Sequence, residues 1–139
     1  MKLKKHKMLI TTCIICLLPI IFGVLVWGRL PDTLAIHFNL NGEPDNFASK
    51  GFVVFGLPLL MALLQIFCYA LSKIDSKKYG NKKFEGVTMW IIPVLTAVLY
   101  ILTLGYGLGW NIDIRIAVML IVLFLIAVTV WEIIARKGQ

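Results

Sequence analysis

Four stretches of the sequence are long and apolar enough to cross a membrane, and this feature constrains the fold more than any other. A helix needs about 20 apolar residues to cross a hydrocarbon core about 30 Å thick, since each residue adds about 1.5 Å. The predicted spans are residues 8–27, 52–71, 87–106 and 114–134. Backbone groups in lipid must bond within their own segment and four segments cannot close a barrel, so each stretch is predicted to be a helix.

The composition excludes a soluble globular protein and a disordered one, because 60% of the residues are hydrophobic and the mean hydropathy is +0.89. Lysines precede the first span as in a signal peptide, but the apolar run is too long and no small-x-small cleavage site follows Trp27. We therefore expect an all-α integral membrane protein in which residues 1–139 form a single four-helix domain.

The basic residues are divided unequally between the two ends of the predicted spans. Those before the first span, between the second and third and after the fourth are Lys2, Lys4, Lys5, Lys7, Lys73, Lys77, Lys78, Lys82, Lys83, Arg136 and Lys137. Only Arg29, Lys50 and Arg115 lie at the other end. Basic residues concentrate on the cytoplasmic side, so both termini and the lysine-rich loop 72–86 are predicted to be cytoplasmic and loop 28–51 extracellular.

The net charge of +7 therefore indicates topology, and the lysine-rich loop is expected to contact anionic lipid headgroups. We expect no nucleic-acid partner, because the sequence has no recognition module and no basic stretch interleaved with aromatic residues.

The predicted outer loop contains a short strand-like segment. Apolar residues occupy every second position from Leu34 to Leu40, and a period of two is typical of a half-buried strand. Asn41 and Gly42 tolerate positive φ and predict a tight turn. Pro44 lacks an N–H donor, so we expect an irregular or briefly helical return instead of a regular second strand. Ser49 is a candidate cap for the second span.

The spacing of the outer loop resembles the module of unknown function that opens SdpI-type bacterial immunity proteins and joins their first two membrane helices on the outside. The residues that carry the resemblance are Pro31, His37, Asn39, Gly42, Pro44, Asp45 and Lys50. The resemblance implies a multi-pass protein of the bacterial plasma membrane that protects a cell from a secreted, membrane-active peptide toxin. Some members are thought to hold a transcriptional repressor at the membrane. Longer members continue past the fourth span, and this chain is shorter than they are.

The candidate partner-binding residues are His37, Asn39, Asp45 and Lys50, while Pro31, Asn41, Gly42 and Pro44 are assigned to the turn structure. The apolar side of the strand is expected to lie on the membrane or on the helix ends, with His37 and Asn39 facing water or a partner. Two structural alternatives stand beside this role. His37 is a hydrogen-bonded structural histidine in the first, and Asp45 pairs with Lys50 in the second, an exposed interaction worth about 0–1 kcal/mol.

We expect no metal, no cofactor and no catalysis. A metal site on His37, Glu43 and Asp45 lacks a second histidine or a cysteine. Cys13 and Cys16 have CxxC spacing but lie inside an apolar span, where thiolates are unfavourable. No ionisable residue lies deep in a span, which disfavours ion pumps and proton-coupled carriers, and no catalytic set of side chains is arranged as intramembrane proteases require.

The spans also contain small residues and prolines that bear on packing. Gly105 and Gly109 have the small-xxx-small spacing of close helix contacts, so they are assigned to helix packing or to a homo-oligomer. Pro19, Pro58 and Pro93 each interrupt one of the first three spans.

Two functions of other classes remain beside toxin immunity. The glycine pair and the proline kinks are also compatible with a small accessory subunit or carrier of a membrane transport system. The lysine-rich loop is also compatible with a membrane sensor that sequesters a cytoplasmic regulator.

Thiol labelling tests the predicted orientation. In a chain with Cys13, Cys16 and Cys68 replaced by alanine, we expect a membrane-impermeant thiol reagent to label His37→Cys in intact cells. Gly80→Cys should react only after the membrane is permeabilised, because the positive-inside bias places it in the cytoplasm. Labelling of residue 80 but not residue 37 in intact cells would overturn the topology.

Overall fold

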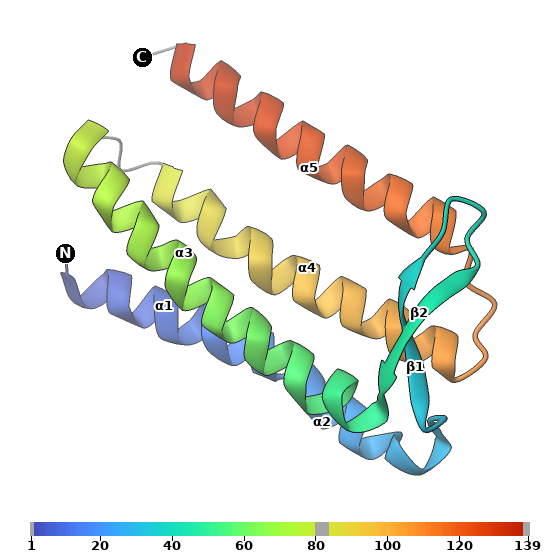
Figure 1. Ribbon diagram of the computed structural model, residues 1–139. Helices are drawn as coiled ribbons and strands as arrows, with labels where there is room; N and C mark the ends of the chain where they lie inside the picture. Colours follow the sequence, from blue (N-terminus) through green and yellow to red (C-terminus); the bar gives the residue numbers. More distant parts are fainter. Residues whose placement is uncertain (1, 80–83, 138–139) are drawn as a thin grey trace.

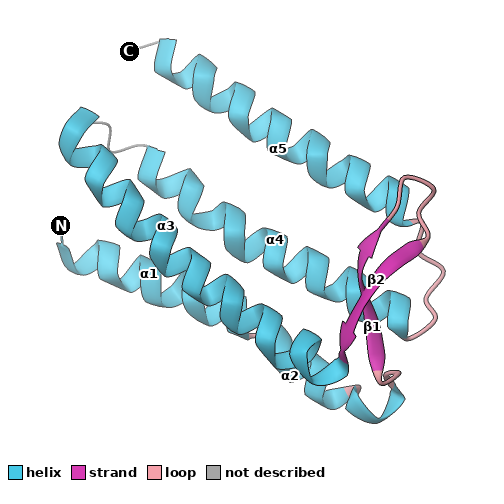
Figure 2. Ribbon diagram, viewed as in Figure 1, coloured by secondary structure: helices cyan, strands magenta, loops and turns pink. Residues whose placement is uncertain are grey.

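The computed structural model describes residues 2–79 and 84–137 as a bundle of helices with a small β-hairpin across one end (Figures 1 and 2). In chain order the elements are α1 (Lys2–Leu17), α2 (Pro19–Leu25), the 3-10 turn η1 (Trp27–Arg29), β1 (Thr33–Phe38), β2 (Pro44–Ser49), the π-helical segment η2 (Phe52–Gly56), α3 (Leu57–Tyr79), α4 (Phe84–Gly107) and α5 (Ile114–Lys137). Helices α1, α3 and α4 pack against one another, whereas α5 contacts α4 more sparsely.

Within the described residues, four helical segments are long and apolar enough to cross a membrane, which confirms the number of spans predicted. They are His6–Leu25, Phe52–Leu71, Met89–Gly107 and Ile114–Trp131. The beginnings of α1 and α4 and the ends of α3 and α5 lie at the end of the bundle opposite the hairpin (Figure 1). An apolar surface of this length fits a membrane lipid environment.

Much of the predicted lysine-rich segment 72–86 is helical. Helix α3 continues to Tyr79 and α4 begins at Phe84, so only residues 80–83 separate the two helices, and those residues lie outside the described part of the chain. Lysine is a good helix former, and a helix that leaves the hydrocarbon can continue in water with its charged side chains solvated.

Pro58 leaves a backbone carbonyl in the second span without its usual donor. A proline has no N–H, so the carbonyl of Val54, four residues earlier, loses its α-helical partner. The Tyr100 hydroxyl of α4 donates a hydrogen bond to this oxygen at 3.2 Å, and the Tyr100 side chain is buried. A Cβ on Gly23 of α2 would overlap that hydroxyl. The absence of a side chain at Gly23 therefore lets α2, η2 and α4 meet at this point.

Pro93 produces the same situation in α4, because it removes the donor for the carbonyl of Met89. The fully buried Gln65 of α3 donates to that carbonyl at 2.9 Å, and its second amide hydrogen reaches the Thr12 hydroxyl oxygen of α1 at 2.9 Å. One side chain thus links three helices by hydrogen bonds that lipid could not replace. Gln65 therefore has a role in the assembly of the bundle.

The hairpin is fixed to the bundle by a hydrophobic core at the same end. Its buried members are Leu30, Leu34, Val53, Val54, Tyr100 and Leu104. Leu34 lies so close to Gly107 at the end of α4 that a Cβ on this glycine would overlap it. The Phe38 and Tyr106 rings meet edge to face with centroids 5.0 Å apart. Strand β1 is therefore seated directly on α4.

Replacing Tyr100 by phenylalanine is expected to lower the free energy of unfolding by about 1–2 kcal/mol, because the Val54 carbonyl then loses the hydrogen bond from Tyr100. Unfolding in mixed micelles with increasing denaturing detergent measures this difference. Tyr106→Phe is the matched control, since the Tyr106 hydroxyl makes no hydrogen bond within the described residues. Equal stability of the two variants would contradict the assignment.

Candidate functional site

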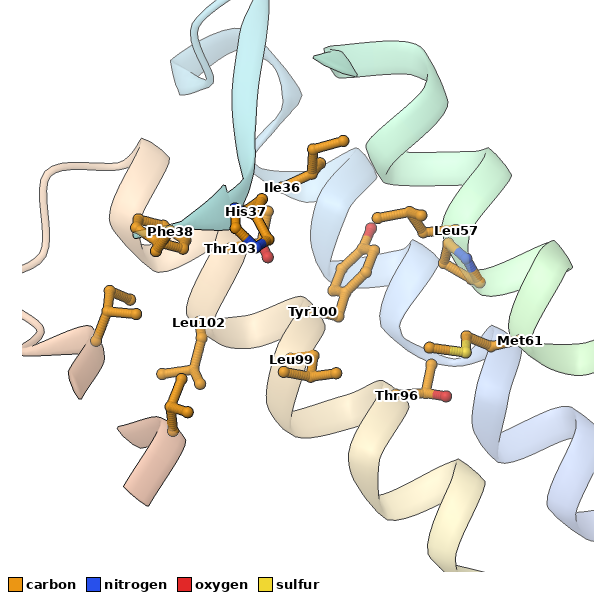
Figure 3. A pocket seen from close by; sticks show the side chains of 13 residues that line it. Ile36, His37, Phe38, Leu57, Met61, Thr96, Leu99, Tyr100, Leu102 and Thr103 are labelled. Carbon is orange, nitrogen blue, oxygen red and sulfur yellow. The ribbon is translucent and has the colours of Figure 1, made fainter. Parts of the chain in front are cut away.

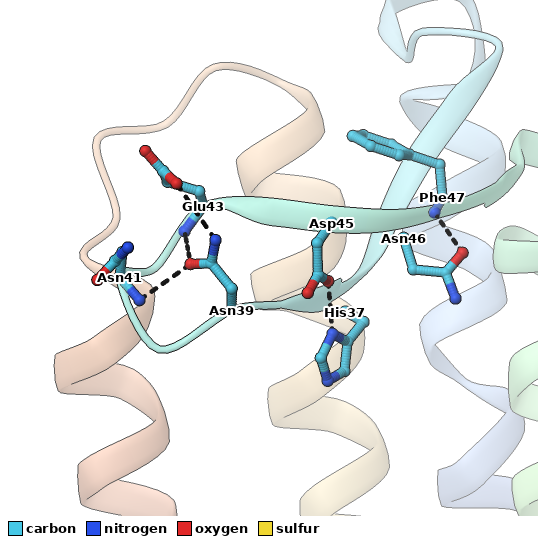
Figure 4. Close-up of polar contacts among 7 residues, drawn as sticks. All are labelled: His37, Asn39, Asn41, Glu43, Asp45, Asn46 and Phe47. Carbon is cyan, nitrogen blue, oxygen red and sulfur yellow. Dashed lines mark hydrogen bonds and ion pairs between the residues drawn. The ribbon is translucent and has the colours of Figure 1, made fainter.

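The turn of the hairpin is held by the side chain of Asn39 (Figure 4). Its Oδ1 accepts hydrogen bonds from the backbone N–H groups of Asn41 and Glu43 at 2.9 and 3.0 Å. Gly42 has a φ of 81°, in the region that glycine favours, and its N–H donates to the Asn39 carbonyl at 2.9 Å. The structure therefore places Asn39 in the turn, with its side-chain oxygen already occupied, while Gly42 alone takes the positive φ that the sequence suggested.

The expectation of an irregular or helical return after the turn is wrong, because residues Pro44–Ser49 form strand β2, antiparallel to β1. Pro44 is the first residue of the strand and lies opposite Phe38, a position at which a missing N–H is tolerated. The strand ends at Ser49, whose Oγ accepts a hydrogen bond from the N–H of Phe52 at 3.3 Å. This is the cap that the sequence predicted.

The pairing of the two strands is interrupted on either side of His37. The register shifts between Ala35 and His37 and again between His37 and Phe38. Leu34 and Ala35, which precede the shift, are both buried, so the predicted alternation from Leu34 to Leu40 is wrong. Side chains of a regular strand point to opposite faces in turn, whereas a bulge re-aims them. Ile36, His37 and Phe38 therefore face the same cavity despite being consecutive.

That cavity, which we call the hairpin groove, has a volume of about 520 Å³ and lies between β1, α3, α4 and α5 (Figure 3). Its lining residues are Ile36, His37, Phe38, Leu57, Pro58, Met61, Thr96, Leu99, Tyr100, Leu102, Thr103, Ile114 and Val118. The lining is mostly apolar and the groove opens to the surface of the bundle. The groove has the size and character of sites that bind ligands with long apolar parts.

His37 lines the groove, and Asp45 of β2 contacts His37 without being a lining residue itself; we call these two side chains the polar rim. His37 Nδ1 lies 2.5 Å from Asp45 Oδ1 (Figure 4). An ionised carboxylate only accepts hydrogen bonds, so Nδ1 carries the proton and Nε2 remains free to interact elsewhere. The predicted pairing of Asp45 with Lys50 is therefore wrong. Asp45 contacts His37 instead, and Lys50 contacts Asp32.

Lys50 lies at the base of the hairpin and not at the groove. Its Nζ is 3.3 Å from Asp32 Oδ1, donates to the Leu30 carbonyl at 3.4 Å and lies 5.0 Å from the centre of the Trp27 ring. Only 17% of its side chain is exposed. These contacts fasten the end of β2 to η1, so the structure separates Lys50 from the other residues proposed to bind a partner.

Arg115, which is held by Asp113, joins the start of α5 to the hairpin. Asp113 Oδ1 accepts from the Arg115 backbone N–H at 3.0 Å, and its two oxygens accept from the guanidinium at 3.2 and 3.1 Å. The side-chain hydrogen bond from Arg115 lowers the pKa of Asp113, which keeps the pair intact until the pH falls through that lowered value. A Cβ on Gly42 would lie 3.1 Å from Arg115 Cγ, so α5 touches the hairpin turn.

Gly109 makes no contact with another helix within the described part of the chain. Gly109 lies beyond the end of α4 with a φ of 77°, and nothing lies within 4 Å of a Cβ built on it. Its N–H donates to the Tyr106 carbonyl at 3.0 Å, and the next N–H, of Trp110, donates to the Gly105 carbonyl at 2.9 Å. These bonds form the Schellman motif that ends helices at a glycine. Gly105 packs against the Trp110 and Ile112 side chains of its own following loop.

Sequence reasoning missed the part of the groove that α3, α4 and α5 supply, notably Met61, Leu99 and Val118. Apolar residues in a span carry no signal that separates a groove from a lipid-facing surface. Pro58 and Pro93 did carry a signal. Each leaves the carbonyl four residues earlier without its helical donor, which implies a donor from another helix. Among the residues that the structure describes, no three histidine, cysteine, aspartate or glutamate side chains gather as a metal site.

Residues 14–62 match the model of a family described only as a domain of unknown function, DUF1648. The matched segment runs from Ile14 in α1 through the hairpin and η2 into the first half of α3, which is less than half of the chain. No curated protein and no solved structure matches the chain. The match therefore includes the β1 side of the hairpin groove and its lining residues on α3.

Gly42→Ala is expected to weaken the hairpin by about 1 kcal/mol, because a side chain at positive φ is strained. Amide hydrogen exchange at Asn39, whose N–H donates to the Glu43 carbonyl, should become about fivefold faster. Gly28→Ala is the control, since nothing lies within 4 Å of a Cβ there and its φ is not positive. Equal exchange in both variants would show that Gly42 does not hold the turn.

Proposed function

We propose that this chain is a multi-pass protein of the bacterial plasma membrane, similar to SdpI-type immunity proteins, that protects the cell from a secreted, membrane-active peptide. Both termini lie in the cytoplasm in this proposal, and the hairpin lies at the outer surface. The peptide is intercepted at the hairpin groove before it can assemble in the membrane. The single observation that carries the proposal is this groove, an open and mostly apolar cavity at the hairpin end of the bundle.

The position of the groove suits a peptide that arrives from outside. The hairpin covers the end of the bundle, and the groove extends from β1 down to Met61 and Thr96 of α3 and α4 (Figure 3). A peptide adsorbed on the outer leaflet buries its apolar face only about 5–10 Å into the membrane. It would therefore reach the groove without crossing the bilayer.

Two backbone irregularities border the groove and support a binding role. The π-helical segment η2 leads directly into Leu57 and Pro58, which line it on one side. The shifted register of β1 brings His37 to it on another side. Single π-helical turns and β-bulges are both frequent at functional sites, where they re-aim side chains at a cost in regular hydrogen bonding.

One side of the groove lies in the part of the chain that resembles immunity proteins. The hairpin residues that carry the resemblance include His37 and Asp45, which form the polar rim. The hairpin and η2 both lie inside the segment that matches the domain of unknown function. The wall formed by α4 and α5 lies outside it.

A matched pair of substitutions on α5 tests the proposal. Val118 lines the groove and Val122 does not, although both residues are 47% exposed and lie one helical turn apart. Val118→Trp fills the groove and is expected to lower the peptide concentration that cells survive by about tenfold, which corresponds to about 1.4 kcal/mol of lost binding. Val122→Trp should protect as well as the original chain.

The measurement is survival of a sensitive bacterium that expresses each variant at the same level, challenged with membrane-active peptides secreted by related strains. Membrane insertion of each variant is checked by fractionation. If no peptide in the panel is resisted better by cells with the protein than without it, the proposed function is wrong. If both tryptophan variants lose protection equally, the groove is not the site.

A further inference from the structure

We infer that the hairpin groove selects a cationic amphipathic peptide, whose apolar face fills the groove and whose lysine or arginine pairs with Asp45 at the rim. This inference deepens the proposed function and rests on it for the site of capture. It adds the charge class of the peptide and the residue that recognises that charge.

The charges at the hairpin end are unequally available. Lys50 is largely buried and held by Asp32, and Arg115 is paired through two hydrogen bonds with Asp113. Glu43 contacts only neutral partners, its carboxylate accepting from the Asn39 amide at 3.2 Å. Asp45 contacts the histidine that lines the groove. The remaining basic residue of this end, Arg29, lies on η1 at the base of the hairpin.

Asp45 is therefore the carboxylate best placed to bind a cation beside the groove. Its Oδ1 is occupied by His37, whereas its Oδ2 accepts no hydrogen bond within the described residues. About two fifths of the side chain is exposed, at 42%. The Nδ1–H of His37 holds Oδ1 and so orients the carboxylate, which leaves Oδ2 to a ligand. An ammonium or guanidinium of a ligand can then form a charge-assisted hydrogen bond with Oδ2.

The combination of this carboxylate with the groove matches one ligand chemistry. Peptides that bind membrane surfaces carry lysine and arginine on one helix face and leucine, phenylalanine or tryptophan on the other. The apolar lining of the groove receives the leucine, phenylalanine or tryptophan face. The carboxylates of Asp45 and Glu43 attract the lysine and arginine face. A peptide with carboxylates in place of the basic residues would meet like charges, which are unfavourable across an interface.

Binding of two synthetic peptides to the full-length protein in phosphatidylcholine nanodiscs tests the inference. The probes are a fluorescent amphipathic helix of leucine and lysine and its counterpart with glutamate at every lysine position. Empty nanodiscs give the background that is subtracted. We expect the lysine peptide to bind at least about tenfold more tightly than the glutamate peptide in low salt.

Three variants locate the contact. Asp45→Asn retains an oxygen for His37 but removes the charge, and should weaken lysine-peptide binding about tenfold without weakening the glutamate peptide. Asp32→Asn makes the same charge change at a fully exposed side chain beside Lys50 and should change binding less than about twofold. Val118→Trp should weaken both peptides, because it fills the groove.

Equal affinities of the two peptides, or equal effects of Asp45→Asn and Asp32→Asn, would overturn the inference. It would also be overturned if native mass spectrometry shows a phospholipid retained in the groove that the lysine peptide does not displace. These outcomes differ from a failure of the proposed function. If the protein protects cells but binds both peptides equally, only the inference is wrong. If it prefers the lysine peptide but gives no protection, only the immunity role is wrong.

Discussion

A backbone carbonyl that loses its helical donor inside a membrane has to find another donor within the protein, because lipid supplies none. Two prolines create this requirement in the middle spans, and two side chains meet it. Tyr100 donates to the carbonyl that Pro58 leaves free, and Gln65 donates to the one that Pro93 leaves free. Each donor comes from a different helix than the proline it compensates. The bundle is therefore held by specific bonds where apolar packing alone gives little preference for one neighbour over another.

The same bonds place the candidate site. Tyr100 and Pro58 both line the hairpin groove, so the contact that satisfies the second span also forms part of the groove wall. Gly23 permits that contact, and Leu34 and Gly107 seat β1 on α4 a short distance away. The hairpin is thus not an independent appendage. Its position follows from the packing of three helices around one freed carbonyl.

Much of the fold was predictable from local sequence, whereas most of the site was not. Apolar stretches longer than a bilayer is thick specify spans, and a glycine after Asn41 specifies a turn, because each depends on the residues themselves. The pairing of His37 with Asp45 depends on a register shift in β1, and that shift depends on how β1 packs on α4. The prediction of this strand assumed that apolar residues alternate regularly, and a regular alternation does not include a register shift. Lys50 was misassigned for the same reason, since its partners lie across the fold and not along the strand.

The groove itself follows from the way α5 is attached. Only 6% of its membrane-spanning segment Ile114–Trp131 is buried within the protein, against 33% for the spans in α3 and α4. Its described links to the hairpin end run through Asp113, Arg115 and the turn at Gly42, and these hold the start of the helix without drawing its apolar length onto α4. In water such a gap would be strongly unfavourable, but in a membrane lipid tails solvate both walls and no hydrophobic force closes it. An apolar cavity of this kind does not by itself discriminate between a lipid tail and an apolar peptide. Discrimination has to come from polar groups at its rim, and the bulge in β1 supplies one by turning His37, with Asp45 behind it, toward the groove.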